Sequence, residues 1–470
     1  MKKLGLAFVL GLFLFSCKGT SYIENGGSIN EKTHLIHFAS DDENVAVVEV
    51  HTKKGDVVKE GEHLKSGSEI VVEAVFKDYD FEVESWLINS KPTHQKLKSF
   101  SYTIKEDLNI QLKLNKLTFD ETKPNIVFKI PEVDGKDEVD LNLFLAGKKA
   151  GQTIQIDFGD GIKTDYVFES TKAGQITRRI DIPCEVKIYG GLTLLEATQN
   201  KYISEISFYN SNSLKIVRLS QNKISKVDLA TIPACKELQI TDNKITEIDL
   251  TPCAELDEFY CSYNKITTFD VSKNKRLTVL TCHHTEITTL NISNNPLLEV
   301  LTAGGNKYSK EIVFDNNPLI RSLDLENVGF SSINLSNLKK LEKLRLMGNN
   351  LKEIKLENNV ALQYLDVGNN KLEAIDVSML PMLEELRLNK NKLKNLDLSK
   401  NDRLRIIKLQ DNEFSACSLN KLFLSMKPPL NNDNGFGIAG NPDASTSNTK
   451  IAKDKGWRLD IEGDGSAVCQ

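Results

Sequence analysis

Metal chemistry is the first possibility to weigh in this sequence, because Cys282, His283 and His284 follow one another and Cys261 precedes them by 21 residues. Thiolates and imidazoles are the ligands that zinc prefers in tetrahedral sites. The segment, however, alternates apolar and polar residues, as a β-strand does, and successive strand side chains point to opposite faces. Cys282 should then point inward and His283 outward, so they cannot share one ion. We predict no metal and no cofactor, and we expect Cys261 and Cys282 to be buried free thiols on adjacent strands.

Two acidic loops raise the possibility of calcium sites. Asp157 and Asp160 stand beside Gly159 and Gly161, and a second loop reads Gly463-Asp464-Gly465. A calcium loop needs a run of alternating oxygen ligands, which neither segment has. Asp-Gly pairs are common in tight turns. We therefore predict turns at both places.

Catalysis is not indicated by the sequence. The motifs GxSxG, HExxH and the phosphate-binding loop do not occur among the 470 residues, and the chain has only seven histidines. The hydrophobic fraction of 40% suits a soluble chain of several domains. The formal net charge of -5 provides no broad basic field for nucleic acid. We predict a protein that is not an enzyme, with no catalytic residues and no nucleic-acid partner.

The N-terminus has the layout of a secretion signal. Lys2 and Lys3 precede an apolar run over residues 4–15, which is too short to span a bilayer. Leu14-Phe15-Ser16-Cys17 resembles a bacterial lipoprotein lipobox, in which the cysteine is acylated. We expect a signal peptide over residues 1–17, lipidation at Cys17 and a linker over 18–33; the alternative is an ordinary signal peptide. Lys18 after the cysteine resembles lipoproteins of the outer membrane, so we expect an outer-membrane location, with exposure at the cell surface as one option.

Internal repeats dominate the second half of the chain. A pattern close to LxxLxLxxNxIxxIDLSxN recurs in steps of 21 residues, with a single step of 22. The position that marks the phase of the repeat is occupied by Asn222, Asn243, Asn264, Thr285, Asn306, Val328, Asn349, Asn370, Asn391 and Asn412. Equivalent residues of successive repeats stack into ladders in solenoid proteins. The spacing predicts about ten stacked coils.

Each column of the repeat has an expected role. Apolar residues that alternate with polar ones, as around Val217 and Leu219, predict a short parallel strand with one face inward. The phase-marking asparagines should hydrogen-bond backbone groups at a bend. A second asparagine set should serve the other bend: Asn274, Asn295, Asn317, Asn359 and Asn401. A column of aspartates should face solvent: Asp228, Asp249, Asp270, Asp376 and Asp397.

Strings such as YCSYNKITTFDVSKNKRLTVL and YLDVGNNKLEAIDVS resemble the 21-residue repeats of internalin-type bacterial leucine-rich-repeat proteins. The resemblance implies a mainly β fold: a solenoid over residues 191–414 with a parallel sheet on its concave side. It also implies a β-rich module over 34–115, a β-rich cap over 117–190 and a C-terminal cap over 415–470. Leu419, Leu422 and Phe423 would cover the last coil, and Cys417 and Cys469 could form a disulfide, although sequence alone leaves cysteine pairing open.

The outward strand positions are the candidate binding surface. One cluster is apolar and aromatic, with Tyr260, Val279, His283 and Val300. A second cluster combines Arg345, Tyr364 and Arg387. Tyrosine and arginine recur as binding hot spots. The competing interpretation is an idle, solvent-facing sheet, because exposed β-branched residues also favour strands.

The predicted function is binding without catalysis. The resemblance implies a monomer that recognises a protein or glycan outside the cell, in adhesion or host interaction, and that touches the membrane only through its lipid anchor. The alternative is a scaffold on the periplasmic side that holds another envelope protein.

Overall fold

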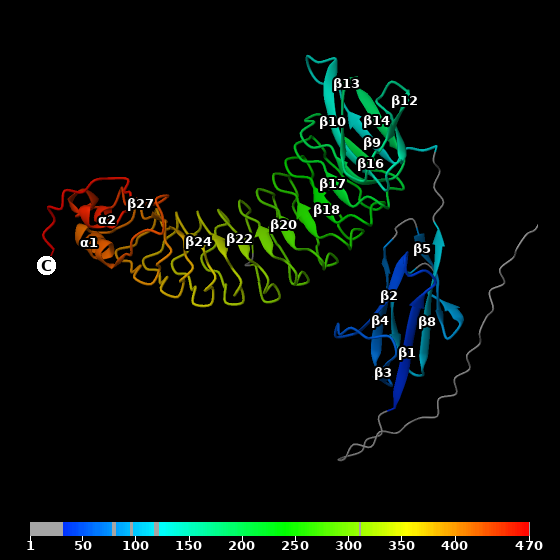
Figure 1. The fold of residues 1–470 in the computed structure, drawn as a ribbon, viewed down its shortest axis with the longest axis horizontal. Coiled ribbons are helices and arrows are strands. Elements are labelled where there is room, and N and C mark those ends of the chain that lie inside the picture. The colour runs from blue at the N-terminus through cyan, green and yellow to red at the C-terminus, as the bar shows by residue number, and fades with distance from the viewer. Residues whose placement is uncertain (1–31, 78–80, 95–96, 117–121, 310–311, 470) are drawn as a thin grey trace, which may run out of the picture. The chain divides into compact units, whose positions relative to one another are not determined.

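The computed structural model describes residues 32–469 except 78–80, 95–96, 117–121 and 310–311. The expected signal peptide, most of the linker and Cys17 lie outside the described residues. The described residues form two compact units, one that ends at Asn115 and one that follows it, and both are drawn in Figure 1. In the described part of the chain, no helix combines the length and the apolarity needed to cross a membrane.

The first unit is a small β-sandwich. One sheet has the order β3-β1-β8-β5-β6 and the other the order β2-β4-β7. Ile70, Val72 and Ala74 alternate inward along β4, as the period-two pattern predicts, and pack with the fully buried Trp86. The strands are β1 (Thr33–Ser40), β2 (Ala46–Thr52), β3 (Glu62–Lys65), β4 (Glu69–Phe76), β5 (Phe81–Ile88), β6 (Lys91–Thr93), β7 (Ser99–Thr103) and β8 (Leu108–Lys116).

The second unit begins with a β-rich cap. Its separate sheet has the order β12-β11-β14-β9-β16, while β10 and β13 join the large sheet of the solenoid. The bounds are β9 (Ile126–Ile130), β10 (Glu138–Gly147), β11 (Thr153–Asp157), β12 (Lys163–Val167), β13 (Gly174–Asp181), β14 (Cys184–Tyr189), β15 (Leu192–Glu196) and β16 (Glu205–Phe208). Strand β10 pairs with β15, the first strand of the solenoid, so the cap covers the apolar end of the first coil.

The solenoid forms one continuous parallel sheet from β15 through β17 to β27, as Figure 1 shows for most of its length. Each coil contributes a three-residue strand in register with the next. These strands are β17 (Ile216–Arg218), β18 (Glu237–Gln239), β19 (Glu258–Tyr260), β20 (Val279–Thr281), β21 (Val300–Thr302), β22 (Ser322–Asp324), β23 (Lys343–Arg345), β24 (Tyr364–Asp366), β25 (Glu385–Arg387), β26 (Ile406–Lys408) and β27 (Gly435–Gly437). The predicted leucine-rich-repeat solenoid is confirmed.

Asparagine ladders hold the two bends in most coils, as predicted. In Asn391, the side-chain amide donates to the carbonyl oxygens of Val367 and Leu388, both at 3.0 Å, while its oxygen accepts the backbone N–H of Leu372 at 3.0 Å. Across the coil, fully buried Asn317 donates to two carbonyls, at 3.0 and 2.9 Å. Both ladders satisfy backbone groups that a short strand leaves unpaired.

The limits of the solenoid differ from the expected residues 191–414. Strand β16 lies within the first coil, yet it pairs with β9 of the cap sheet, so cap and solenoid interleave. At the other end, β27 continues the parallel sheet after β26, and Asn441 continues the ladder by donating to the carbonyl of Leu409 at 2.9 Å. The repeat pattern fails after residue 414 because an insertion lengthens that step, although the backbone still completes a coil.

The C-terminal segment closes the solenoid. Helix α1 (Ala416–Ser425) buries Leu419, Leu422 and Phe423 in the main core, as expected. Short helices η1 (Ala444–Thr446) and α2 (Lys450–Asp454) follow. Cys417 and Cys469 form a disulfide that ties the chain end to α1.

Candidate ligand-binding face

The sheet face is formed by the outward side chains of the parallel strands. In each three-residue strand the middle residue is buried, and the two flanking residues are mostly half-buried. The structure therefore brings every predicted binding residue onto one surface. This face divides into a neutral sector, defined by Tyr260, Val279, Thr281, His283, Val300 and Thr302, and a charged sector, defined by Asp324, Lys343, Arg345, Tyr364, Asp366, Glu385 and Arg387.

Tyr364 is the centre of the charged sector. The guanidinium groups of Arg345 and Arg387, on the strands either side, each lie 5.3 Å from the centre of its ring. The ammonium group of Lys343 lies 5.5 Å from the same centre. Cations at such distances are attracted by the electrons of the ring face. The phenol is thereby fixed on the sheet by its neighbours.

Carboxylates pair with these arginines. Arg345 lies 3.6 Å from Asp324, and Arg387 lies 3.3 Å from Glu385. Asp366 is only 6% exposed, and its carboxylate accepts the backbone N–H of Gly368 at 3.0 Å. Burial raises the pKa of Asp366 above its usual range, although that hydrogen bond and the arginines oppose the rise. The charges of this sector are therefore arranged before any ligand arrives.

The neutral sector adjoins the charged sector, since β21 pairs with β22, but it has a different chemistry. Val279 faces Val300, and Thr281 faces Thr302, across the paired strands β20 and β21. Tyr260 donates its hydroxyl to Glu258 at 2.7 Å. Burial, with a smaller contribution from His284, lowers the pKa of His283, so its ring is uncharged at neutral pH.

A further row of residues was missed by sequence reasoning. The residue before each ladder position has a positive φ, in the left-handed region that L-residues seldom adopt. The row is Gln221, Asp242, Tyr263, His284, Gly305, Asn327, Gly348, Asn369, Lys390, Asp411 and Gly440. Its high content of glycine, asparagine and aspartate was the available signal. This row places Tyr263 and His284 beside the neutral sector.

The cysteines near the face are structural. Cys261 and Cys282 are fully buried free thiols on neighbouring coils, as predicted, and burial raises the pKa of both. Both Cys282 and His283 follow strand β20, and Cys282 is buried in the core while His283 is partly exposed. Among the described residues, no group of three or more histidine, cysteine or acidic side chains could hold a metal ion.

The acidic loops are turns. Asp157 accepts the backbone N–H groups of Gly159 and Gly161 at 2.9 and 3.0 Å, and Asp160 accepts that of Ile162 at 2.9 Å. Asp464 likewise accepts from Ser466 at 2.8 Å. These carboxylates are occupied by backbone donors, which is the tight-turn geometry that Asp-Gly pairs predict.

The outward aspartate column is more than a solvated row. It is exposed, as expected, but each carboxylate accepts the backbone N–H two residues later, at 2.8 to 3.0 Å. For Asp249 and Asp376 these hydrogen bonds lower the pKa. The column therefore shapes a turn in each coil, which sequence reasoning overlooked.

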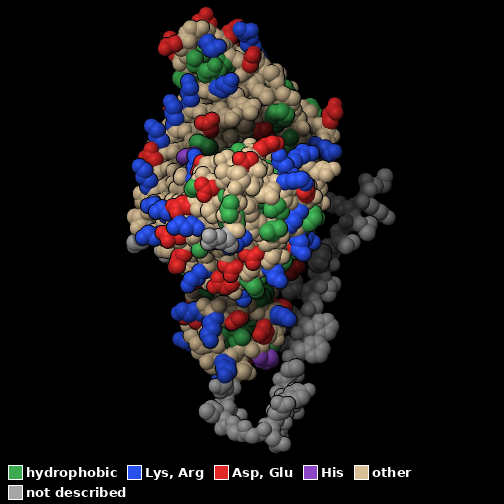
Figure 2. Space-filling view, turned by 90° about the vertical axis from the view of Figure 1, so that its left-hand side faces the viewer, with side chains coloured by type: hydrophobic (Ala, Val, Ile, Leu, Met, Phe, Trp, Pro, Cys, Tyr) green, Lys and Arg blue, Asp and Glu red, His purple; other side chains and the backbone are tan. Residues whose placement is uncertain are grey.

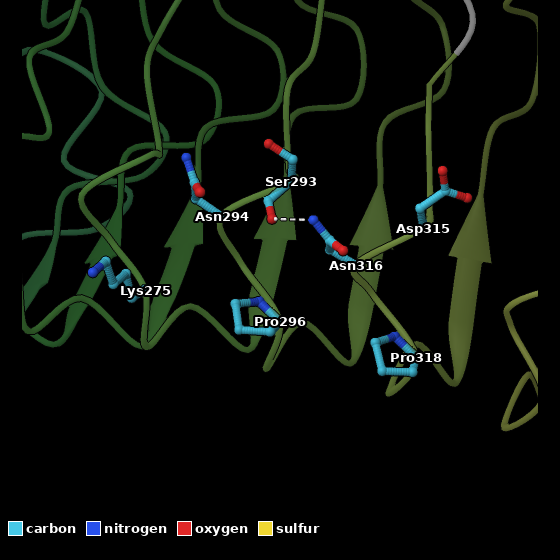
Figure 3. Close-up of a pocket in the computed structure, with 7 residues that line it drawn as sticks. All are labelled: Lys275, Ser293, Asn294, Pro296, Asp315, Asn316 and Pro318. Atoms are coloured by element: carbon cyan, nitrogen blue, oxygen red, sulfur yellow. Dashed lines mark hydrogen bonds between the residues drawn. The ribbon is translucent and has the colours of Figure 1, made fainter. Parts of the chain in front are cut away.

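An open hollow of about 520 Å³ lies away from the sheet face. Figure 3 shows its lining at the bend that carries the second asparagine ladder, where Pro296 and Pro318 occupy equivalent places in adjacent coils. Asn316 donates to the carbonyl of Ser293 at 3.1 Å. This hydrogen bond holds neighbouring coils together at the hollow.

The surface charge of the molecule is mixed. On the view of Figure 2, lysines and arginines lie among aspartates and glutamates, without a large field of one sign.

No family model and no curated protein matches the chain. Solved structures that resemble it include the functional domain of InlJ from Listeria monocytogenes, which includes a cysteine ladder, at 21% identity over 49% of this chain, with a TM-score of 0.41. The chain spans 66% of that domain. The internalin InlF from the same organism is 20% identical, covers 58% of this chain and 87% of its own, with a TM-score of 0.47. The Toll–Spätzle complex of Drosophila is 17% identical over 50% of this chain and 39% of that chain, with a TM-score of 0.39.

Proposed function

We propose that the protein is a non-catalytic, lipid-anchored envelope protein that binds a protein or glycan outside the cell through its sheet face, in adhesion or host interaction. The observation that carries the proposal is the stack of Arg345, Tyr364 and Arg387 on three neighbouring strands. These residue types dominate binding energy in protein interfaces.

Rigidity supports this use of the face. The three strands are held by continuous parallel pairing, and the side chains are held by ring and carboxylate contacts. A surface that is ordered before binding loses less conformational entropy when the ligand arrives. The partly exposed arginines retain donors for a ligand, since the side chains of Arg345 and Arg387 are 36% and 40% exposed.

The anchor part of the proposal rests on sequence. Cys17 follows a charged and then apolar leader, and acylation there would tether the mature chain to the membrane. Replacing Cys17 by serine should release the protein from the membrane fraction. A Cys17→Ser protein that stays in that fraction would contradict the anchor while leaving the binding face untested by that experiment.

The binding proposal is tested with the mature protein as bait. Host extracts and extracts of the producing cell's own envelope are passed over wild-type protein and over Tyr364→Ala. We expect a host component that is retained by the wild type and lost by the variant, together with protease access to the solenoid on intact cells. Retention of an envelope component alone, with the solenoid protected from protease, would replace this function by the periplasmic scaffold.

A further inference from the structure

Three rings gather at one edge of the neutral sector and form an aromatic shelf, defined as Tyr263, His283 and His284. The ring centres of Tyr263 and His284 lie 5.1 Å apart, those of Tyr263 and His283 lie 5.9 Å apart, and those of the two histidines lie 4.3 Å apart. Tyr263 is 53% exposed, which is high for a large aromatic residue. The shelf presents ring surface to solvent where a lysine or aspartate stands in other coils.

The backbone beneath the shelf is unusual. Tyr263 and His284 have φ values of 55° and 49°, in a row that other coils fill mainly with glycine, asparagine, aspartate or other polar residues. A bulky ring in this conformation is strained, and strain of this kind concentrates at functional places. Nothing in the packing of the coil requires a ring at either position, since Asn327 and Asn369 adopt the same φ in later coils.

The coil next to the shelf has two consecutive glycines, Gly304 and Gly305, and therefore no side chain at either position. A Cβ atom on Gly304 would lie 2.9 Å from Nδ1 of His283, and one on Gly305 would lie within 2.6 Å of two ring atoms of His284. The rings therefore extend over bare backbone. Gly305 donates its N–H to the carbonyl of Glu326 at 2.7 Å, so the next coil follows directly.

Glu326 of the next coil lies beside the glycine pair, since a Cβ atom on Gly304 would lie 2.9 Å from its backbone nitrogen and 2.8 Å from its carbonyl oxygen. Burial, with the charges of Asp324 and Asp366, raises the pKa of Glu326, although Arg345 and Arg387 oppose the rise. A ligand that donates hydrogen bonds to Glu326 would stabilise its charged form against this burial. Strands β20 and β21 carry no charged side chain at their outward positions.

These surroundings select against a charged ligand. A partner's glutamate would be repelled by Asp324 and Glu326. A partner's lysine would find Asp324 already paired with Arg345 at 3.6 Å and the charge of Glu326 offset by Arg345 and Arg387, so it would lose its water for little gain. A pyranose ring, by contrast, has an apolar C–H face that suits the negative face of an aromatic ring, and hydroxyl groups that suit carboxylates.

We propose that the aromatic shelf, the Gly304–Gly305 pair and the carboxylate of Glu326 form a binding site for a neutral saccharide. The sugar ring lies on the exposed rings of Tyr263 and His284, the second of which packs over Gly305, and its hydroxyl groups donate to Glu326. This site rests on the proposed function, because it assigns a ligand class to part of the same sheet face.

The test uses variants that remove a ring without straining the backbone. Asparagine tolerates the left-handed region and already occupies this row, so Tyr263→Asn and His284→Asn should fold as the wild type does. Lys390→Asn is the matched control, because it removes a long side chain from the same row with a φ of 58°, far from the shelf. Each protein is measured by calorimetry against neutral, sialylated and sulfated oligosaccharides.

We expect a neutral oligosaccharide to bind the wild type, with the Kd raised about tenfold or more in each ring variant and changed by less than about twofold in Lys390→Asn. Preferential binding of sialylated or sulfated glycans, binding of no glycan, or an unchanged Kd in Tyr263→Asn would overturn the site. If the host component found with the bait depends on Tyr364 but no glycan binds, the saccharide site fails while the proposed function stands. A protein ligand lost in Tyr263→Asn would show that the shelf binds protein instead.

Discussion

The charged and neutral sectors share one backbone but differ in how their side chains are prepared for a ligand. Around Tyr364, arginines and carboxylates already contact one another, so the surface is ordered and its charges are largely balanced. Around Val279 and Val300, the outward side chains are uncharged, and the nearby shelf leaves its rings exposed. A repeat scaffold can therefore hold two chemistries side by side, because its ladders fix the backbone independently of the outward residues.

The largest expected effect is on stability, and it tests whether the ladders fix the backbone equally beneath both sectors. Asn391→Ala beneath the charged sector removes three hydrogen bonds to backbone groups, and Asn306→Ala beneath the neutral sector removes four. Each change should lower the free energy of unfolding by at least about 2 kcal/mol, with the larger loss in Asn306→Ala, measured by urea denaturation. A large loss in one variant and none in the other would show that the two sectors rest on different scaffolds. The double variant Thr281→Ser with Thr302→Ser, which keeps the outward hydroxyls, is the surface control.

The next largest difference between the sectors should be the salt dependence of their ligand affinities. Ligand binding at Arg345 and Arg387 should weaken several-fold between about 0.05 and 0.5 M NaCl, because salt screens exposed charges. Saccharide binding at the aromatic shelf should stay nearly constant over the same range. Titrations of both ligands with the same protein sample provide the comparison. Equal salt dependence for the two ligands would mean that they share one site.

The pH dependence of stability should have opposite signs in the two sectors. The pKa of Asp366 is raised on folding by burial, so its contribution to stability is present at acid pH and is lost as pH rises through the folded pKa. The pKa of His283 is lowered by burial, so its contribution is present above the ordinary histidine pKa and is lost as pH falls below it. Asp366→Asn should raise the Tm at pH 7 more than at pH 3, whereas His283→Gln should flatten the Tm profile below about pH 6.5. Parallel shifts in both variants would contradict these assignments.

The smallest effect concerns the aspartate column, which lies on neither sector. Asp249→Ala and Asp376→Ala should lower the Tm slightly through loss of the turn hydrogen bonds, with less difference at acid pH, where the carboxylates are protonated. Ligand affinity should be unchanged at both sectors. Scanning calorimetry with parallel binding assays checks both statements, and loss of binding without a change in Tm would move the binding surface to this column.

The sequence predicted the contacts that depend on the 21-residue period of the repeat. Residues 21 positions apart lie on adjacent strands, so the contact of Arg345 with Tyr364, and of Tyr364 with Arg387, follows from counting two residues along one strand and one period to the next. The same counting placed Cys261 and Cys282 in the core. Ladder roles could be assigned because the asparagine amide donates to buried carbonyl groups in both ladders, and in most members of the first ladder its oxygen also accepts a backbone N–H.

What the sequence did not predict depends on local conformation and on insertions. The exposed positions of Tyr263 and His284 follow from a positive φ, which an average pattern of apolar and polar residues does not encode. The role of Gly304 and Gly305 is likewise visible only when the rings of the preceding coil are placed. The last coil was missed because the insertion before Asn441 breaks the 21-residue count, although its hydrogen bonds are those of the ladder.

The most direct measurement of the central claim is the affinity of the host component for Tyr364→Ala, with Tyr209→Ala as the matched control. Tyr209 is 48% exposed and lies beside the cap, away from the sheet face. Loss of a central aromatic anchor commonly costs about 2 kcal/mol or more, which corresponds to a Kd raised about thirtyfold. The account predicts that rise for Tyr364→Ala at an unchanged oligomeric state and fold, and no change for Tyr209→Ala. Full affinity in Tyr364→Ala, or equal losses in both variants, would contradict binding through the sheet face.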